Sequence, residues 1–202
     1  MRPTGINSVN FFLNYRDETI PVRLPLPGKH SVYTALRAAA VGLMAGLSWE
    51  EIVAGLEMEQ TQLRMITKRL PNGAMLIDDT YNASPKSMMA ALDLLENAAG
   101  RKVAILGGML ELGVDERAGH ERVGARAAAV ADLLITVGEL GKMIADSALA
   151  NGMDTTVVWS AADPAVAVST VEELIRPTDT ILVKASRGIG LDRLVSSLTG
   201  SN

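Results

Sequence analysis

Two adjacent carboxylates directly follow an apolar run in the stretch IDDTYNASPKSMM, which begins at Ile77. Asp78 and Asp79 are followed by Tyr81 and Asn82, so polar groups gather where a β-strand is predicted to end. In α/β proteins, ligands bind at the carboxyl ends of parallel strands, and a carboxylate there can hold the hydroxyl groups of a ribose. An Asp at a strand end also caps turns, and the spacing alone favours this simpler interpretation.

A second polar cluster follows another apolar run, in the stretch ILVKASRG. Lys184, Ser186 and Arg187 supply an ammonium, a hydroxyl and a guanidinium directly before a predicted helix. Such groups bind anions, and the N–H groups at the start of a helix add to the attraction. Two solvated cations at the rim of a sheet are the simpler interpretation. Because both clusters are expected at the same end of one sheet, the pattern favours a ligand-binding site.

Two glycine-containing motifs lack the spacing that phosphate binding requires. GELGKM, residues 138–143, has only two residues between its glycines, and Met143 stands where a phosphate loop has Ser or Thr. We predict an ordinary strand-to-helix turn there, and GIG at 188–190 is an equally weak signal. The sequence contains no phosphate loop. His30 lies just before a predicted helix and His120 on a polar helix face; each alone indicates a structural or solvated residue, and no metal site is predicted.

The composition of the 202 residues excludes several functional classes. Hydrophobic residues make up 48% and aromatic residues 3%, so an aliphatic core is expected and a base-stacking surface for nucleic acid is not. The net charge of -4 also argues against a phosphate-backbone partner. The absence of cysteine excludes disulfides and thiolate catalysis. No signal peptide or membrane span is predicted, so we expect a cytoplasmic protein.

The pattern of apolar residues changes near residue 60 and predicts two units. Before it, VNFFLNY and TIPVRLPL are predicted strands of a hairpin, and a helix is predicted from Ser31 to near Gly46. Ser48 and Glu51 form the spacing of a capping box for a second, short helix. Residues 1–60 are therefore predicted to form an incomplete α+β unit.

After residue 60, strands and helices alternate. LRMITKRL and AMLIDD flank a PNG turn, and VAILGG, LLITVG, TVVW and TILVKA do not alternate apolar with polar residues, which predicts strands buried on both faces. Helices are predicted after the Ser84-Pro85 pair, near 117–130, 140–150 and 163–174, and after Arg187. This order predicts an α/β fold for residues 61–202, with a Rossmann-like, mostly parallel, doubly wound sheet.

Several of these stretches together resemble the Mur ligases. IDDTYNASPKSMMAAL, VAILGGMLELG and ILVKASRG resemble the C-terminal domain of this family, and LPGKHSVYTALRAAAVGL resembles the segment that ends its central ATPase domain. The resemblance implies that residues 1–60 are the last part of the central domain and that residues 61–202 are the C-terminal domain. The family's phosphate loop, modified lysine and magnesium-binding Glu and His precede the region covered. The chain is therefore expected to be the last part of a longer ligase, whose N-terminal and central domains are its partners.

The resemblance also implies a reaction and its substrates. ATP, with Mg²⁺, phosphorylates the terminal carboxylate of a UDP-linked tripeptide in peptidoglycan precursor synthesis, and the amine of D-alanyl-D-alanine attacks the acyl phosphate. By family analogy Arg64 and Asp79 contact the nucleotide, with Asp79 on the ribose. The other residues assigned to the nucleotide are Tyr81, Asn82 and His30, and those assigned to the dipeptide pocket are Lys184, Ser186 and Arg187.

No catalytic residue and no tightly bound cofactor are expected in this chain alone, which is predicted to be inactive by itself. Two alternatives remain open. A ligase of the same superfamily that adds glutamate or another amino acid is one, although DDTYN argues against it. A non-catalytic α/β module that binds a small anion or a partner protein is the other.

Overall fold

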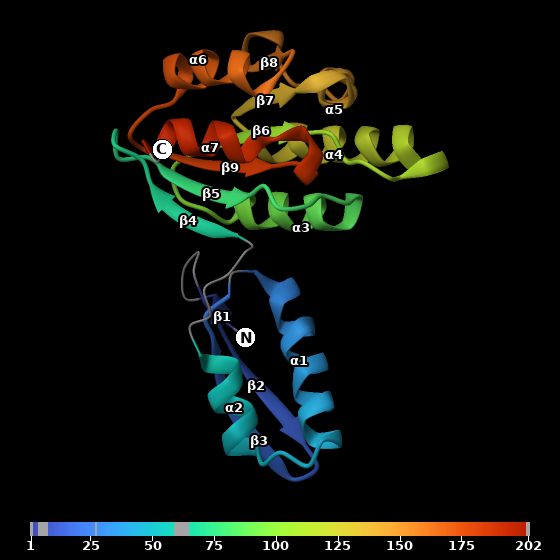
Figure 1. Cartoon of the computed structure of the whole chain (residues 1–202), viewed down its shortest axis with the longest axis vertical. Coiled ribbons are helices and arrows are strands. Elements are labelled where there is room, and N and C mark those ends of the chain that lie inside the picture. Colours follow the sequence, from blue (N-terminus) through green and yellow to red (C-terminus); the bar gives the residue numbers. More distant parts are fainter. Residues whose placement is uncertain (1, 4–7, 27, 59–64, 201–202) are drawn as a thin grey trace. The chain divides into compact units, whose positions relative to one another are not determined.

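The computed structural model describes residues 2–3, 8–26, 28–58 and 65–200 (Figure 1). The chain divides into two compact units, Met1–Thr61 and Gln62–Asn202. Each unit contains its own sheet, one of three strands and one of six. The division falls close to the point in the sequence where the pattern of apolar residues changes.

The smaller unit is an antiparallel sheet with two helices packed on one face. Alternate residues of the second and third strands, such as Phe11 and Val22, are buried with Ala35, Ala39 and Ile52 of the helices. The elements are β1 (Arg2–Pro3), β2 (Val9–Tyr15), β3 (Glu18–Leu24), α1 (Lys29–Met44) and α2 (Trp49–Glu57).

The capping box predicted for α2 is confirmed. The Glu51 N–H donates to Ser48 Oγ over 3.3 Å, and the Ser48 N–H donates to Glu51 Oε2 over 2.8 Å. Two N–H groups that the first turn leaves unpaired are thereby satisfied, which fixes where the helix begins.

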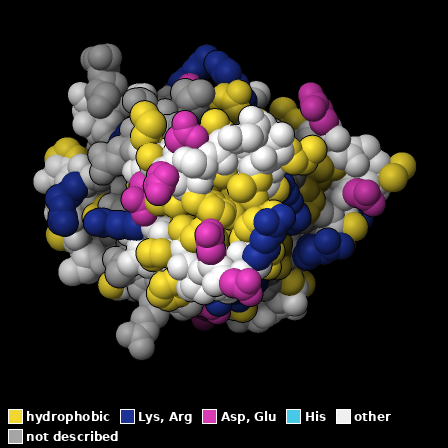
Figure 2. Space-filling view, turned by 90° about the horizontal axis from the view of Figure 1, so that it is seen from below, with side chains coloured by type: hydrophobic (Ala, Val, Ile, Leu, Met, Phe, Trp, Pro, Cys, Tyr) yellow, Lys and Arg dark blue, Asp and Glu magenta, His cyan; other side chains and the backbone are white. Residues whose placement is uncertain are grey.

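Helix α1 is apolar on its outer surface as well as on its core side. Ala35 and Ala39 face the core, whereas Tyr33, Leu36 and Met44 are exposed, Met44 by 89%. On the face of the molecule drawn in Figure 2, hydrophobic side chains gather near the centre. A helix that is apolar around most of its circumference is typical of a buried position.

The larger unit is built on a six-stranded sheet in the order β4-β5-β9-β6-β7-β8. Strand β4 runs antiparallel to β5, and every other neighbouring pair is parallel. This arrangement confirms the predicted Rossmann-like, mostly parallel sheet. The strands are β4 (Ile66–Arg69), β5 (Met75–Asp79), β6 (Arg101–Gly107), β7 (Leu133–Val137), β8 (Val158–Ala161) and β9 (Asp179–Lys184).

Helices cover both faces of this sheet. Helices α6 and α7 bury Val171 and Leu194 against one set of alternating strand residues, which includes Leu76, Ile105 and Val183. Helices α3, α4 and α5 pack on the opposite face (Figure 1). The helices are α3 (Pro85–Glu96), α4 (Glu116–Val130), α5 (Gly138–Ala150), α6 (Pro164–Leu174) and α7 (Leu191–Thr199).

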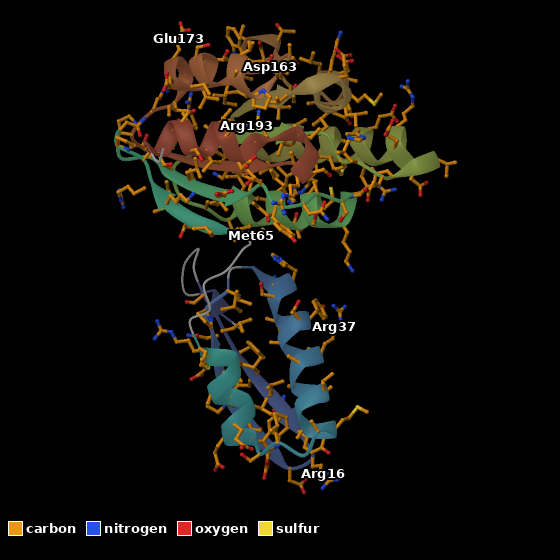
Figure 3. All side chains as sticks on the ribbon, viewed as in Figure 1. Arg16, Arg37, Met65, Asp163, Glu173 and Arg193 are labelled. Carbon is orange, nitrogen blue, oxygen red and sulfur yellow. The ribbon has the colours of Figure 1, made fainter. Side chains whose placement is uncertain are left out.

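Two helices of this unit begin where the sequence predicts. Ser84 and Asp163 are the residues before the first turns of α3 and α6, and each is followed by proline. The Asp163 carboxylate (labelled in Figure 3) accepts hydrogen bonds from the N–H groups of Ala165 and Val166. Proline at this position loses no hydrogen bond, because its N–H would have no partner inside the helix.

Two details differ from the prediction. Strand β8 begins at Val158 and forms the edge of the sheet, so Trp159 is 44% exposed and the prediction that this strand is buried on both faces is wrong. The last helix does not directly follow Ser186. A short 3₁₀ turn, Arg187–Ile189, comes first, and Gly190 has the positive φ of 77° that reverses the chain before α7.

Charged side chains join elements that are distant in the sequence. At the amino edge of the sheet, Arg101 Nη2 lies 2.8 Å from Asp179 Oδ2 and also donates to the Leu174 carbonyl, and the Asp179 side chain has no exposed surface. On the surface, Arg126 of α4 donates to Glu96 of α3 over 2.6 Å. This hydrogen bond lowers the pKa of the Glu96 carboxyl below its ordinary value.

Candidate functional site

The two polar clusters of the sequence meet at the carboxyl edge of the larger sheet. Asp79, the last residue of β5, is the register partner of Lys184, the last residue of β9. Lys184 is in turn paired with Leu106, near the end of β6. Three parallel strands therefore end side by side, which confirms that both clusters lie at the same end of the sheet.

Lys184 and Asp79 form a buried ion pair. Lys184 Nζ lies 2.6 Å from Asp79 Oδ2, and the two side chains are only 2% and 9% exposed. Lys184 Nζ also donates to the Asn82 carbonyl over 2.8 Å. Val183 packs under α6 and α7, so the next residue, Lys184, projects to the opposite face, where α3 lies. The ammonium thereby connects the end of β9 to the loop that follows β5.

Ser186 connects the same ends by hydrogen bonds. Its Oγ accepts from the Leu110 N–H over 2.9 Å and donates to the Ala83 carbonyl over 3.4 Å. Its own N–H donates to the Gly108 carbonyl over 3.0 Å. The residue is 4% exposed. Its hydroxyl therefore holds together the loops that follow β5, β6 and β9.

Arg187 lines a small pocket at this edge. The pocket has a volume of about 180 Å³, and the Arg187 guanidinium carbon lies 5.8 Å from the centre of the Tyr81 ring. The residues around it are Ile66, Asp78, Thr80, Tyr81, Arg187 and Asp192. Arg187, Asp78 and Asp192 give the pocket groups of both charges. Such a set can bind a small molecule that carries a carboxylate and an ammonium.

The two cations and the hydroxyl group that were expected in one anion site have different surroundings. Lys184 and Ser186 are buried and bonded to neighbouring loops, whereas Arg187 is exposed. The N–H groups of α7 also begin further along the chain than expected, because the 3₁₀ turn separates Ser186 from Leu191.

The other predicted nucleotide residues have different surroundings. Tyr81 and Asn82 are exposed in the loop after β5, and Asn82 Oδ1 accepts a hydrogen bond from the Ala83 N–H. Arg64 lies outside the described residues. His30 is exposed in the first turn of α1 and therefore belongs to the smaller unit.

His120 is placed differently from the prediction. The prediction of a polar helix face is wrong, because His120 is completely buried. Its Nε2 accepts a hydrogen bond from the Met109 N–H over 2.9 Å, so its Nδ1 carries the proton and donates to the Glu116 carbonyl over 2.6 Å. The imidazole thus fixes the loop after β6, in agreement with a structural role.

Besides Ile66, two polar residues that line the pocket were not predicted from the sequence. Thr80 stands between the predicted Asp79 and Tyr81, so its position in the motif was a usable signal. Asp192 is an ordinary acidic residue in the first turn of α7, and only the fold brings it to the pocket.

The sequence profile of a protein family described as "Mur ligase, glutamate ligase domain" matches residues 63–187, more than half of the chain. This chain belongs to the Mur ligase family. The resemblance noted in its motifs is therefore confirmed, and the site, apart from Asp192, lies within the region that this Mur ligase shares with the family profile.

Named relatives of this Mur ligase chain are similar over most of its length. A UDP-N-acetylmuramoyl-tripeptide–D-alanyl-D-alanine ligase of Synechocystis is 36% identical over 91% of the chain, and one of Bacillus subtilis is 36% identical over 88%. The crystal structure of MurF from Acinetobacter baumannii covers 97% of the chain, with 33% identity and a TM-score of 0.84. The chain spans 40% of the length of both relatives and 43% of that crystallised chain.

Two further properties of this Mur ligase chain bear on its site. None of the helices in the described ranges is both long and apolar enough to cross a membrane. Within residues 8–26, 28–58 and 65–200, no three or more His, Cys, Asp or Glu residues form a group that could hold a metal ion.

Proposed function

We propose that this chain is the C-terminal part of an ATP-dependent ligase that joins D-alanyl-D-alanine to UDP-N-acetylmuramoyl-tripeptide. The observation that carries the proposal is that Asp79, which ends β5, lies at the same edge of the sheet where Tyr81 and Arg187 approach each other. This edge offers a carboxylate for a ribose and a guanidinium for a carboxylate. The names of the relatives from Synechocystis and Bacillus subtilis support the choice of substrates.

In this proposal the two polar clusters have separate ligands. Asp79 accepts hydrogen bonds from the ribose of ATP, and Arg64, Tyr81, Asn82 and His30 are assigned to the same nucleotide. Arg187 binds the terminal carboxylate of the dipeptide, because a guanidinium can donate two parallel hydrogen bonds to it. The pocket of about 180 Å³ beside Arg187 is small, as a dipeptide of two alanines requires.

The chemistry proceeds in two steps. The γ-phosphoryl group of ATP moves to a carboxylate oxygen of the tripeptide, which releases ADP. The amine of the dipeptide then attacks the acyl carbon, an amide bond forms, and phosphate leaves. Phosphoryl transfer depends on a phosphate-binding loop and Mg²⁺. We assign both to the part of the ligase that precedes this chain, and we assign no catalytic residue to the chain itself.

The proposal also covers the two units and the location of the protein. Residues 1–60 are assigned to the end of the central ATPase domain, and residues 61–202 to the C-terminal domain. The nucleotide and the UDP-sugar peptide are substrates of the cytoplasm, where we place the ligase. An acyl phosphate is labile in water, so ligase action requires the domains to close around the substrates.

The test is a phosphate-release assay with the whole protein that contains this chain. Release is expected only when ATP, UDP-N-acetylmuramoyl-tripeptide and D-alanyl-D-alanine are all present. Release with glutamate or another single amino acid in place of the dipeptide would indicate a different ligase of the superfamily. No release with any of these amines would favour a binding module without catalysis.

A further inference from the structure

The buried ion pair at the edge of the sheet joins two residues that the proposed function assigns to different substrates. Asp79 is assigned to the ribose, whereas Lys184 was expected to contact the dipeptide. The structure directs the Lys184 ammonium to Asp79 Oδ2 over 2.6 Å and to the Asn82 carbonyl over 2.8 Å. Both acceptors belong to the motif that begins the loop after β5.

The pocket beside Arg187 lies on the other side of the sheet edge. Asp78, which lines that pocket, alternates with Asp79 along β5, so the two side chains project to opposite faces. Asp192, also in the pocket, belongs to α7, which covers the face opposite to α3. Lys184 projects to the α3 face with Asp79. The ammonium therefore approaches Asp79 and Asn82 rather than the pocket of the dipeptide.

Stability alone is a weak reason for this ion pair. Removing two charges from water costs free energy, and a buried pair is often no more stabilising than apolar residues of the same size. A buried pair does fix the positions of its partners, because any displacement leaves a charge without compensation in a medium of low polarity. The Lys184 side chain is among the largest that are fully buried in the described part of the chain.

We infer that Lys184 is a positioning residue for the nucleotide motif and not a ligand of the dipeptide. Its ammonium holds the Asp79 carboxylate in place, and its second hydrogen bond holds the loop at Asn82. The consequence for ATP rests on the proposed function, whereas the consequence for the loop rests on the geometry alone. Substitution of Lys184 should therefore weaken nucleotide binding through Asp79.

The kinetic test uses Lys184→Met in the whole protein, because methionine fills similar space without charge. The KM for ATP is expected to rise about tenfold or more, since a shielded charge-assisted hydrogen bond is lost, while the KM for D-alanyl-D-alanine stays within about twofold. Adding Lys184→Met to Asp79→Asn should leave the KM for ATP as it is in Asp79→Asn alone, because Lys184 acts through Asp79. Lys184→Gln, which keeps a donor, is the second variant and should have a smaller effect.

The matched control is Arg101→Met. Arg101 of β6 pairs with Asp179, the first residue of β9, whereas Lys184 is the last residue of β9. This variant therefore also removes the cation that pairs with a buried carboxylate. It is expected to lower the melting temperature without changing the KM for ATP. If Lys184→Met and Arg101→Met differ in no kinetic parameter, Lys184 has only a structural role and the inference is wrong. A rise in the dipeptide KM with an unchanged ATP KM would make Lys184 a dipeptide ligand and would equally overturn it.

A second measurement separates this inference from the proposed function. Amide hydrogen exchange in the 202-residue chain reports on the N–H groups of Thr80, Ala83 and Ser84, which donate to the side chains of Asp78, Asn82 and Ser87, in that order. Lys184→Met should speed their exchange about tenfold, and Arg101→Met should not. If the whole protein shows no ligation, the proposed function fails while this comparison still decides whether Lys184 positions the loop. Equal exchange in the wild type and Lys184→Met would refute the positioning role.

Discussion

The guanidinium carbon of Arg187 lies 5.8 Å from the centre of the Tyr81 ring, so residues from the ends of two different strands share one edge of the sheet. Tyr81 follows β5 and Arg187 follows β9, and more than a hundred residues of sequence separate them. The parallel pairing of β5 with β9 brings them together. The motif that the proposed function assigns to the nucleotide and the cation that it assigns to the dipeptide are thereby neighbours.

Arg187→Ala should change the KM values of the whole protein's two substrates to different extents. The KM for D-alanyl-D-alanine is expected to rise about tenfold or more, because a hydrogen-bonded carboxylate loses its guanidinium, while the KM for ATP changes by less than about twofold. Arg187→Lys should recover only part of the loss, since an ammonium does not donate two parallel hydrogen bonds. Arg193→Ala, on the exposed surface of α7 (Figure 3), is the control and should change neither value. Equal increases in both KM values would contradict the assignment of Arg187.

The 202-residue chain alone should release no phosphate from ATP above the uncatalysed background. The physical reason is that the positioning and charge stabilisation of phosphoryl transfer come from a phosphate loop and Mg²⁺, and the sequence contains no such loop. A coupled phosphate assay with the purified chain, ATP and dipeptide measures this. Release that disappears in Asp79→Ala would show that the chain has its own catalytic centre.

Arg101→Met should lower the free energy of unfolding of the larger unit by about 3 kcal/mol, because a carboxylate without exposed surface loses its cation. Urea denaturation followed by circular dichroism measures the change. Arg117→Met removes the cation of an exposed pair with Glu121 and should change the value by less than about 0.5 kcal/mol. A similar loss in both variants would mean that burial of Asp179 does not determine the cost.

The smaller unit should exchange its amide hydrogens faster than the larger unit. Its three-stranded sheet has helices on one face, and Met44 and Tyr33 expose apolar surface on α1. Fewer buried contacts lower the free energy of local opening, which hydrogen exchange measures directly. Uniform protection across β2, α1, β6 and β9 in a dilute monomer would count against this prediction.

The sequence identified individual elements well because their signals are local. Ser48 with Glu51, Ser84 with Pro85 and Asp163 with Pro164 mark helix starts that need only nearby N–H groups. Unbroken apolar runs predicted the central strands, since both of their faces are covered. The prediction failed at Trp159, because the same kind of run also occurs in a strand at the edge of the sheet.

The sequence by itself determined the Rossmann-like class, the position near residue 60 where the pattern changes, and the two polar clusters at strand ends. These features can be predicted because they depend on local hydrogen bonding and on the period of apolar side chains along the sequence. Only the tertiary structure decided that Lys184 pairs with Asp79 and that Arg187 stays exposed beside Tyr81. Adjacent residues at a strand end project to opposite faces, and which face each side chain meets depends on strands and helices distant in the sequence.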